Sequence, residues 1–106
     1  MSRLPPLVSF IAPSGTGKTT LIEGVLRVLE GKGLRVGVIK HDAHRLYLDT
    51  PGKDSDRYRR AGAWRAVVAS AEQLGLFETL SGTRSLGGLI TDFMSMADIV
   101  IMEGYR

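Results

Sequence analysis

The residues best suited to chemistry form a glycine-rich segment near the start of the chain, Ala12-Pro13-Ser14-Gly15-Thr16-Gly17-Lys18-Thr19-Thr20. Its spacing matches the Walker A pattern, with Ala12 in the place of the first glycine. In such a loop the backbone N–H groups turn inward around an anion, and the following helix directs its positive end at the same point. The segment therefore predicts a site for the phosphates of a nucleotide.

Each side chain of this segment has an expected role. Gly15 and Gly17 permit the backbone torsions that the loop needs. Lys18 supplies a positive charge to the β- and γ-phosphates, and the Thr19 hydroxyl is placed to bind Mg²⁺. We expect phosphate contacts from seven consecutive residues: Ser14, Gly15, Thr16, Gly17, Lys18, Thr19 and Thr20. The competing interpretation is a glycine-rich turn that only caps a helix.

A carboxylate is expected to complete the site. Proteins with this loop commonly place an acid at the end of a neighbouring strand, bound to Mg²⁺ directly or through water. Glu103 follows the apolar run 99–102 and is the natural candidate, so we predict it as a metal ligand and, with Lys18, as a catalytic residue. Asp98 stands at the other end of the same run and is expected to be structural.

A second cluster of polar residues follows another apolar run. Lys40 is predicted to reach a phosphate, and Asp42 to join the metal shell, because ligands bind at the carboxyl edge of such sheets. His41 and His44 are interpreted as polar loop residues, since the chain has no Cys and no firm third ligand for a transition metal.

The elements that must position these residues alternate along the chain. Apolar runs predict buried strands at residues 7–11, 34–40 and 99–102, a further strand at 66–70 and a candidate strand at 73–80. Helices are predicted at 20–32, 54–62 and 85–96. The order predicts an α/β fold of the P-loop NTPase type, with a mostly parallel sheet and helices on both faces. We expect one nucleotide-binding domain over residues 1–106.

Composition narrows the class of protein. The chain has 106 residues, 43% of them hydrophobic, and no Cys. No apolar stretch approaches the ~18–20 residues of a membrane span, and the first residues lack a signal-peptide pattern. We therefore expect a cytoplasmic protein without a membrane partner. The net charge of +3 is small and no long basic run accompanies it, so a nucleic-acid partner is not predicted.

The basic segment 53–60 has two interpretations. In the first, it is a solvated helix face on which Asp56 reaches Arg59 and Arg60. In the second, Lys53 and the cluster Arg57–Arg60 dock an anionic ligand or an acidic partner. Charge alone does not choose between them. The aromatic side chains of Tyr58 and Trp64 are expected to pack against the sheet.

Taken together, four segments resemble the MobB family, the molybdopterin-guanine dinucleotide biosynthesis proteins B. They are Ser14 to Leu21, Ile39-Lys40-His41-Asp42, Pro51 to Ser55 with Arg57 and Ala61-Gly62-Ala63, and Asp98 to Tyr105. The resemblance covers nearly the whole chain, from about Leu7 to Arg106, and its Lys-His-Asp and Pro-Gly-Lys-Asp-Ser segments are its most specific parts.

The resemblance implies a GTP-binding protein with weak Mg²⁺-dependent GTPase activity that forms a homodimer. It also implies action beside MobA, the guanylyltransferase of molybdenum cofactor biosynthesis, and beside proteins that carry molybdopterin. Two departures stand out. Ala12 replaces the usual glycine, and family members continue past the strand that ends at Glu103, so we expect a C-terminally incomplete fold. The expectation that the base is guanine therefore comes from the resemblance alone and not from residues of this sequence.

Two further classes of function stay open. A small-molecule kinase or an ATP-dependent ligase-type enzyme would use the same loop, with Lys40 and the arginine cluster holding a second substrate. A nucleic-acid-binding module rests only on the sequence pI of about 9.6.

Overall fold

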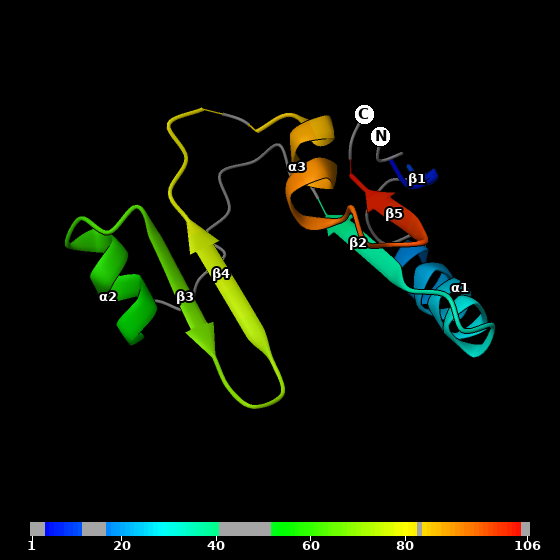
Figure 1. Ribbon diagram of the computed structural model, residues 1–106, viewed down its shortest axis with the longest axis horizontal. Helices are drawn as coiled ribbons and strands as arrows, with labels where there is room; N and C mark the ends of the chain where they lie inside the picture. The colour runs from blue at the N-terminus through cyan, green and yellow to red at the C-terminus, as the bar shows by residue number, and fades with distance from the viewer. Residues whose placement is uncertain (1–3, 12–16, 41–51, 83, 105–106) are drawn as a thin grey trace. The chain divides into compact units, whose positions relative to one another are not determined.

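The computed structural model describes residues 4–11, 17–40, 52–82 and 84–104, which are drawn as coloured ribbon in Figure 1. The contacts divide the chain into two compact units. One consists of Met1–His44 with Ser85–Arg106, and the other is Arg45–Arg84. The expectation of one domain over the whole chain stays a prediction.

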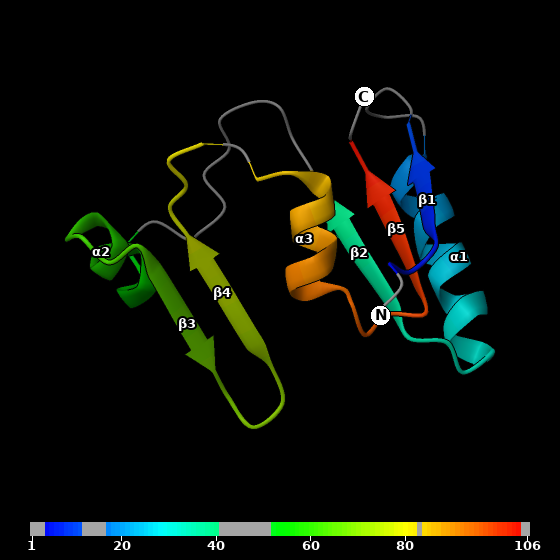
Figure 2. The ribbon, with the colours of Figure 1, turned by 45° about the horizontal axis from the view of Figure 1, so that its top comes forward.

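The first unit is built on a three-stranded parallel sheet, as Figure 2 shows. Its strands are β1 (Leu7–Phe10), β5 (Ile99–Glu103) and β2 (Val36–Lys40), in the order β1-β5-β2. β5 is central and is also the most buried strand, with Val100 and Ile101 both fully inaccessible. Such continuous burial is typical of a parallel strand covered on both faces, so the predicted parallel sheet is confirmed.

Helix α3 (Leu86–Phe93) covers one face of this sheet. Ile90 packs there with Ile39 and Val100, and Met94 packs against the same cluster. Side chains alternate between faces along a strand, so Ile101 and Glu103 belong to the opposite face. An ion pair joins Glu103 to the first residue of helix α1 (Lys18–Gly31), which places α1 at that face.

Glycines mark both ends of α1. Gly17 precedes the helix with φ +81°, a conformation that a residue with a Cβ adopts only at a cost. At the other end Gly33 has φ +78°, and the backbone N–H of Leu34 donates to the Leu29 carbonyl. This closing hydrogen bond is a Schellman-type ending, in which a glycine with positive φ follows the last turn of the helix.

The second unit consists of α2 (Asp54–Arg60), β3 (Arg65–Ala69) and β4 (Leu74–Glu78). β3 and β4 form an antiparallel hairpin that is a sheet of its own, with α2 in contact with β3. Both strands were predicted from their apolar residues, but their separation from the parallel sheet was not. Helix α2 begins at Asp54, and Lys53, at its N-cap position, makes no side-chain capping hydrogen bond.

Candidate functional site

The carboxyl ends of the three parallel strands bring polar and charged side chains to one edge. Glu103 ends the central strand and lies in register with Phe10 of β1 and Lys40 of β2. Residues in register on parallel strands share a face, so Lys40 and Glu103 are neighbours at this edge. The sheet thus places a cation beside the carboxylate that the sequence singles out.

Lys18 meets the same carboxylate from the first turn of α1. Its Nζ lies 3.5 Å from Glu103 Oε1, and the two side chains are only 16% and 15% exposed. The two residues that we predict as catalytic, 85 positions apart in the chain, are therefore adjacent. Their adjacency is an observation, whereas their catalytic roles stay predictions.

The start of α1 keeps its positive character. Among the described residues no side chain caps this end through a hydrogen bond, and the first turn contains no acid. The backbone N–H groups of a first turn have no partner within the helix, and the helix dipole adds a partial positive charge there. Thr19 and Thr20, both exposed, place two hydroxyl-bearing side chains in the same turn. This is the chemistry that a phosphate group requires.

The donors near this turn also fit magnesium. Thr19 offers a hydroxyl and Glu103 a carboxylate, which are the hard oxygen ligands that Mg²⁺ prefers. In the described part of the chain, no group of three or more His, Cys, Asp or Glu side chains is placed to hold an ion. Mg²⁺ is usually bound through one or two carboxylates together with substrate phosphates, so the site fits an ion that arrives with a polyphosphate.

Several predicted site residues lie outside the described ranges. They are Ser14, Gly15 and Thr16 of the loop and Asp42 of the expected metal shell; His41 and His44, interpreted as polar loop residues, also lie outside the described ranges. Their roles stay predictions.

Asp98 has the structural role expected of it. At the opposite edge of the sheet, its carboxylate accepts a hydrogen bond of 2.7 Å from the Arg35 backbone N–H, and its own N–H donates to the Arg35 carbonyl. These two hydrogen bonds hold the residue before β5 next to the residue before β2.

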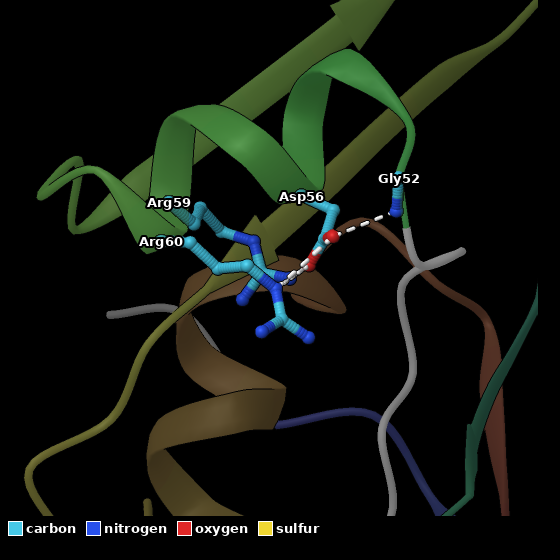
Figure 3. A network of polar contacts seen from close by, with 4 residues as sticks. All are labelled: Gly52, Asp56, Arg59 and Arg60. Atoms are coloured by element: carbon cyan, nitrogen blue, oxygen red, sulfur yellow. Dashed lines mark hydrogen bonds and ion pairs between the residues drawn. The ribbon is translucent and has the colours of Figure 1, made fainter.

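The second unit contains a buried carboxylate at Asp56 (Figure 3). Only 2% of this side chain is exposed. It accepts a hydrogen bond of 2.9 Å from the Gly52 backbone N–H and two, of 3.0 and 3.1 Å, from Arg60 Nε. Arg59 completes the group at 3.9 Å. The Gly52 hydrogen bond, followed by that of Arg60 and the charges of both arginines, outweighs burial and lowers the pKa of Asp56 below its ordinary value of 3.8.

This network corrects the picture of a fully solvated helix face. The ion pairs from Asp56 to Arg59 and Arg60 were predicted from their spacing, but Asp56 itself is interior. Arg59 is also mostly covered and lies 5.8 Å from the centre of the Phe77 ring. The sequence offered one signal, a glycine four residues before Asp56; in the structure Gly52 has φ +85° and its N–H donates to the Asp56 carboxylate.

The two aromatic residues flanking this network are exposed. Tyr58 and Trp64 each expose 62% of their surface, so the expectation that they pack against a sheet was wrong. The indole of Trp64 instead has the Arg65 guanidinium 4.1 Å from its ring centre. Arg65 in turn pairs with Glu78, which also contacts Arg84.

The sequence matches a known protein family and proteins of two bacteria. The family model described as "MobB: Molybdopterin guanine dinucleotide synthesis protein B" matches residues 7–106. The molybdopterin-guanine dinucleotide biosynthesis adapter protein of Escherichia coli is 38% identical, with 95% of this chain aligned to 59% of that protein. The corresponding protein of Haemophilus influenzae is 35% identical, with 100% and 60% aligned.

Solved structures give the same result. The crystal structure of Bacillus subtilis MobB superposes with a TM-score of 0.79 at 32% identity, over 94% of this chain and 61% of that one. The chain thus spans about 60% of the length of each of these three relatives. None of the described helices combines the length and apolar character needed to cross a bilayer.

Proposed function

Because the chain belongs to the molybdopterin guanine dinucleotide synthesis protein B (MobB) family, we propose that it is a GTP-binding adapter protein in the biosynthesis of that dinucleotide. The observation that supports nucleotide binding best is the ion pair between Lys18 and Glu103, at the start of a helix whose positive end no described side chain caps. The names of the relatives support the adapter role.

In this proposal the phosphates of GTP lie at the start of α1. The Lys18 ammonium pairs with the β- and γ-phosphates, and Thr19 and Glu103 hold Mg²⁺ together with Asp42. The residues of the loop from Ser14 to Thr20, and Lys40 from β2, contribute further phosphate contacts. Bound Mg²⁺ would neutralise charge on the phosphates.

Any GTP hydrolysis by this site is proposed to be slow. Lys18 stabilises charge on the transferred phosphoryl group, and water attacks in line. No described side chain is assigned as a base for that water. The adapter role is proposed from the names of the relatives, and the slow hydrolysis from the resemblance to the family.

The proposed partners are a MobA-type guanylyltransferase, proteins that carry molybdopterin and a second copy of this chain. A cytoplasmic location belongs to the same proposal, and the absence of cysteine fits a reducing compartment.

Competition between nucleotides tests the proposal. A fluorescent GTP analogue is bound to the chain in excess Mg²⁺ and displaced with unlabelled GTP or ATP. We expect GTP to displace it at the lower concentration. ATP preference together with phosphoryl transfer to a small acceptor would instead support the kinase or ligase alternative and contradict the GTP-binding adapter.

A further inference from the structure

Helix α2 turns one side to the interior of the second unit and the other side to solvent. Its inner side carries the pair of Asp56 and Arg59, whose side chains are only 2% and 14% exposed. Its outer side carries three exposed cations, Lys53, Arg57 and Arg60. Their spacing of four and three residues places them along one side of the helix and its N-cap. These three residues are called the basic face of α2 below.

The basic face presents positive charge to solvent. No carboxylate of the described residues lies within ion-pairing distance of the Lys53 ammonium or the Arg57 guanidinium. Arg60 pairs with Asp56 through Nε, yet 61% of its side chain is exposed. Figure 3 shows its terminal nitrogens directed away from Asp56. Asp56 thus holds one cation of the face in place without covering it.

Two exposed aromatic side chains adjoin the basic face. Tyr58 belongs to α2, and Trp64 follows a turn in which the Ala63 N–H donates to the Tyr58 carbonyl at 3.0 Å. Tyr58 and Trp64 each expose 62% of their surface. Arginine, tyrosine and tryptophan are the residue types that most often dominate the binding energy of protein–protein interfaces. The composition of this surface therefore fits a protein partner.

Two features count against a free phosphate or a nucleic acid as the ligand. A free phosphate requires converging donors, whereas Lys53 and Arg60 are seven residues apart, which is about 10 Å along a helix. Asp54 is also exposed on the outer side of α2, and its carboxylate repels a continuous row of phosphates. A protein surface can place carboxylates opposite the cations and a neutral or basic group opposite Asp54.

From these observations we propose that the basic face of α2, together with Tyr58 and Trp64, docks an acidic surface of a partner protein. Arg59 does not belong to this docking surface, because it is mostly covered and paired with Asp56. The inference rests on the proposed adapter function only in assuming a protein partner. It goes further in naming where on this chain the partner binds and which charge it carries.

Nuclear magnetic resonance of the isotopically labelled chain tests the inference with a peptide as the probe. The peptide is an alanine-based helix of about 18 residues, long enough to be helical in isolation. It carries Glu at spacings of three and four residues on one face, with Leu beside them. The matched peptide has Gln in place of each Glu. Trp64 is the only tryptophan of the chain, so its indole N–H gives one unambiguous signal.

We expect the Glu peptide to shift the amide signals of α2 and the indole signal of Trp64, and the Gln peptide to shift neither at the same concentration. Replacing Lys53 and Arg57 together by Gln should weaken binding of the Glu peptide about fivefold, because each exposed ion pair contributes modestly. Lys32→Gln, past the far end of α1, should bind the peptide as the wild type does.

Four results would overturn the inference. They are the absence of shifts at α2, equal shifts from the Gln peptide, equal binding by the double variant and the wild type, and tighter binding of a thymidine oligonucleotide at the same residues. The last result would assign the basic face to a nucleic acid. The dispersion of each spectrum checks that the variant is folded.

The outcome is distinct from that of the nucleotide competition. Failure of GTP to outcompete ATP, with the Glu peptide still bound at α2, would contradict GTP binding and leave the docking surface standing. GTP preference without shifts at α2 would contradict the docking surface alone.

Discussion

The carboxylate of Asp56 accepts hydrogen bonds from Arg60 Nε and, on its other side, from the Gly52 backbone N–H (Figure 3). The arrangement ties the beginning of α2 to its last turn through a single interior side chain. The carboxylate is buried, whereas the sequence pattern left open a solvated helix face or a docking surface.

Stability should depend on the ionisation of Asp56. Its pKa in the folded chain is lowered from 3.8, so the folded state favours the ionised form, and the stabilisation is complete above that value. This stabilisation is lost as the pH falls from 3.8 through the lower pKa that Asp56 has in the folded state. Chemical unfolding at a series of pH values, on wild type and Asp56→Asn, should show a difference in unfolding free energy that shrinks over this acidic range. A difference that does not vary with pH would count against the assignment, and Asp54→Asn on the exposed side is the control.

Close packing at Gly37 makes a second prediction. A Cβ at this position of β2 would overlap the sulfur of Met94, which packs against the core next to α3. Gly37→Ala should therefore lower the free energy of unfolding by about 1–3 kcal/mol. Gly24→Ala in α1, where a Cβ meets nothing within 4 Å, should instead raise it by about 0.5–1 kcal/mol.

Urea unfolding measures both changes. Repeating Gly37→Ala in a Met94→Ala background tests the cause, because the smaller side chain leaves room for the added methyl group. The cost of Gly37→Ala should be smaller in that background. An undiminished cost would show that overlap with Met94 is not its source.

The beginning of α3 depends on Ser85. Its Oγ accepts a hydrogen bond of 3.0 Å from the Gly88 backbone N–H, as an N-cap side chain does. Ser85→Ala should destabilise the chain by about 1 kcal/mol, and Ser85→Asp, which can accept the same bond, should keep most of the stability. Thermal unfolding measures the loss of stability in each variant. An equal loss in Ser85→Ala and Ser85→Asp would contradict a capping role for Ser85.

The parallel sheet was predictable because its residues carry local signals. The runs predicted at residues 7–11, 34–40 and 99–102 are mostly apolar, and the carboxyl ends of parallel strands meet at one edge, so Glu103 was expected near the helix that follows the glycine-rich loop. Lys18 and Glu103 are brought together in this way. The sequence pattern did not predict the distance between the Lys18 ammonium and the Glu103 carboxylate.

The second unit was less predictable. Alternation of strands and helices indicated one continuous sheet, but β3 and β4 pair only with each other. Strand pairing across a sheet depends on contacts distant in sequence, which a local pattern does not encode. Asp56 shows the same limit, because a spacing of three or four residues predicts ion pairs equally well for a buried and for an exposed carboxylate.

Titration of the GTP analogue in excess Mg²⁺ against wild type, Lys18→Ala and Lys32→Ala tests whether the nucleotide binds at the start of α1. Lys32 follows the far end of α1 and is exposed, so Lys32→Ala changes the charge of the chain equally without touching the edge of the sheet. We expect Lys18→Ala to weaken binding by about tenfold or more and Lys32→Ala to leave it unchanged. Binding that is the same in wild type and Lys18→Ala would contradict a nucleotide site at the start of α1.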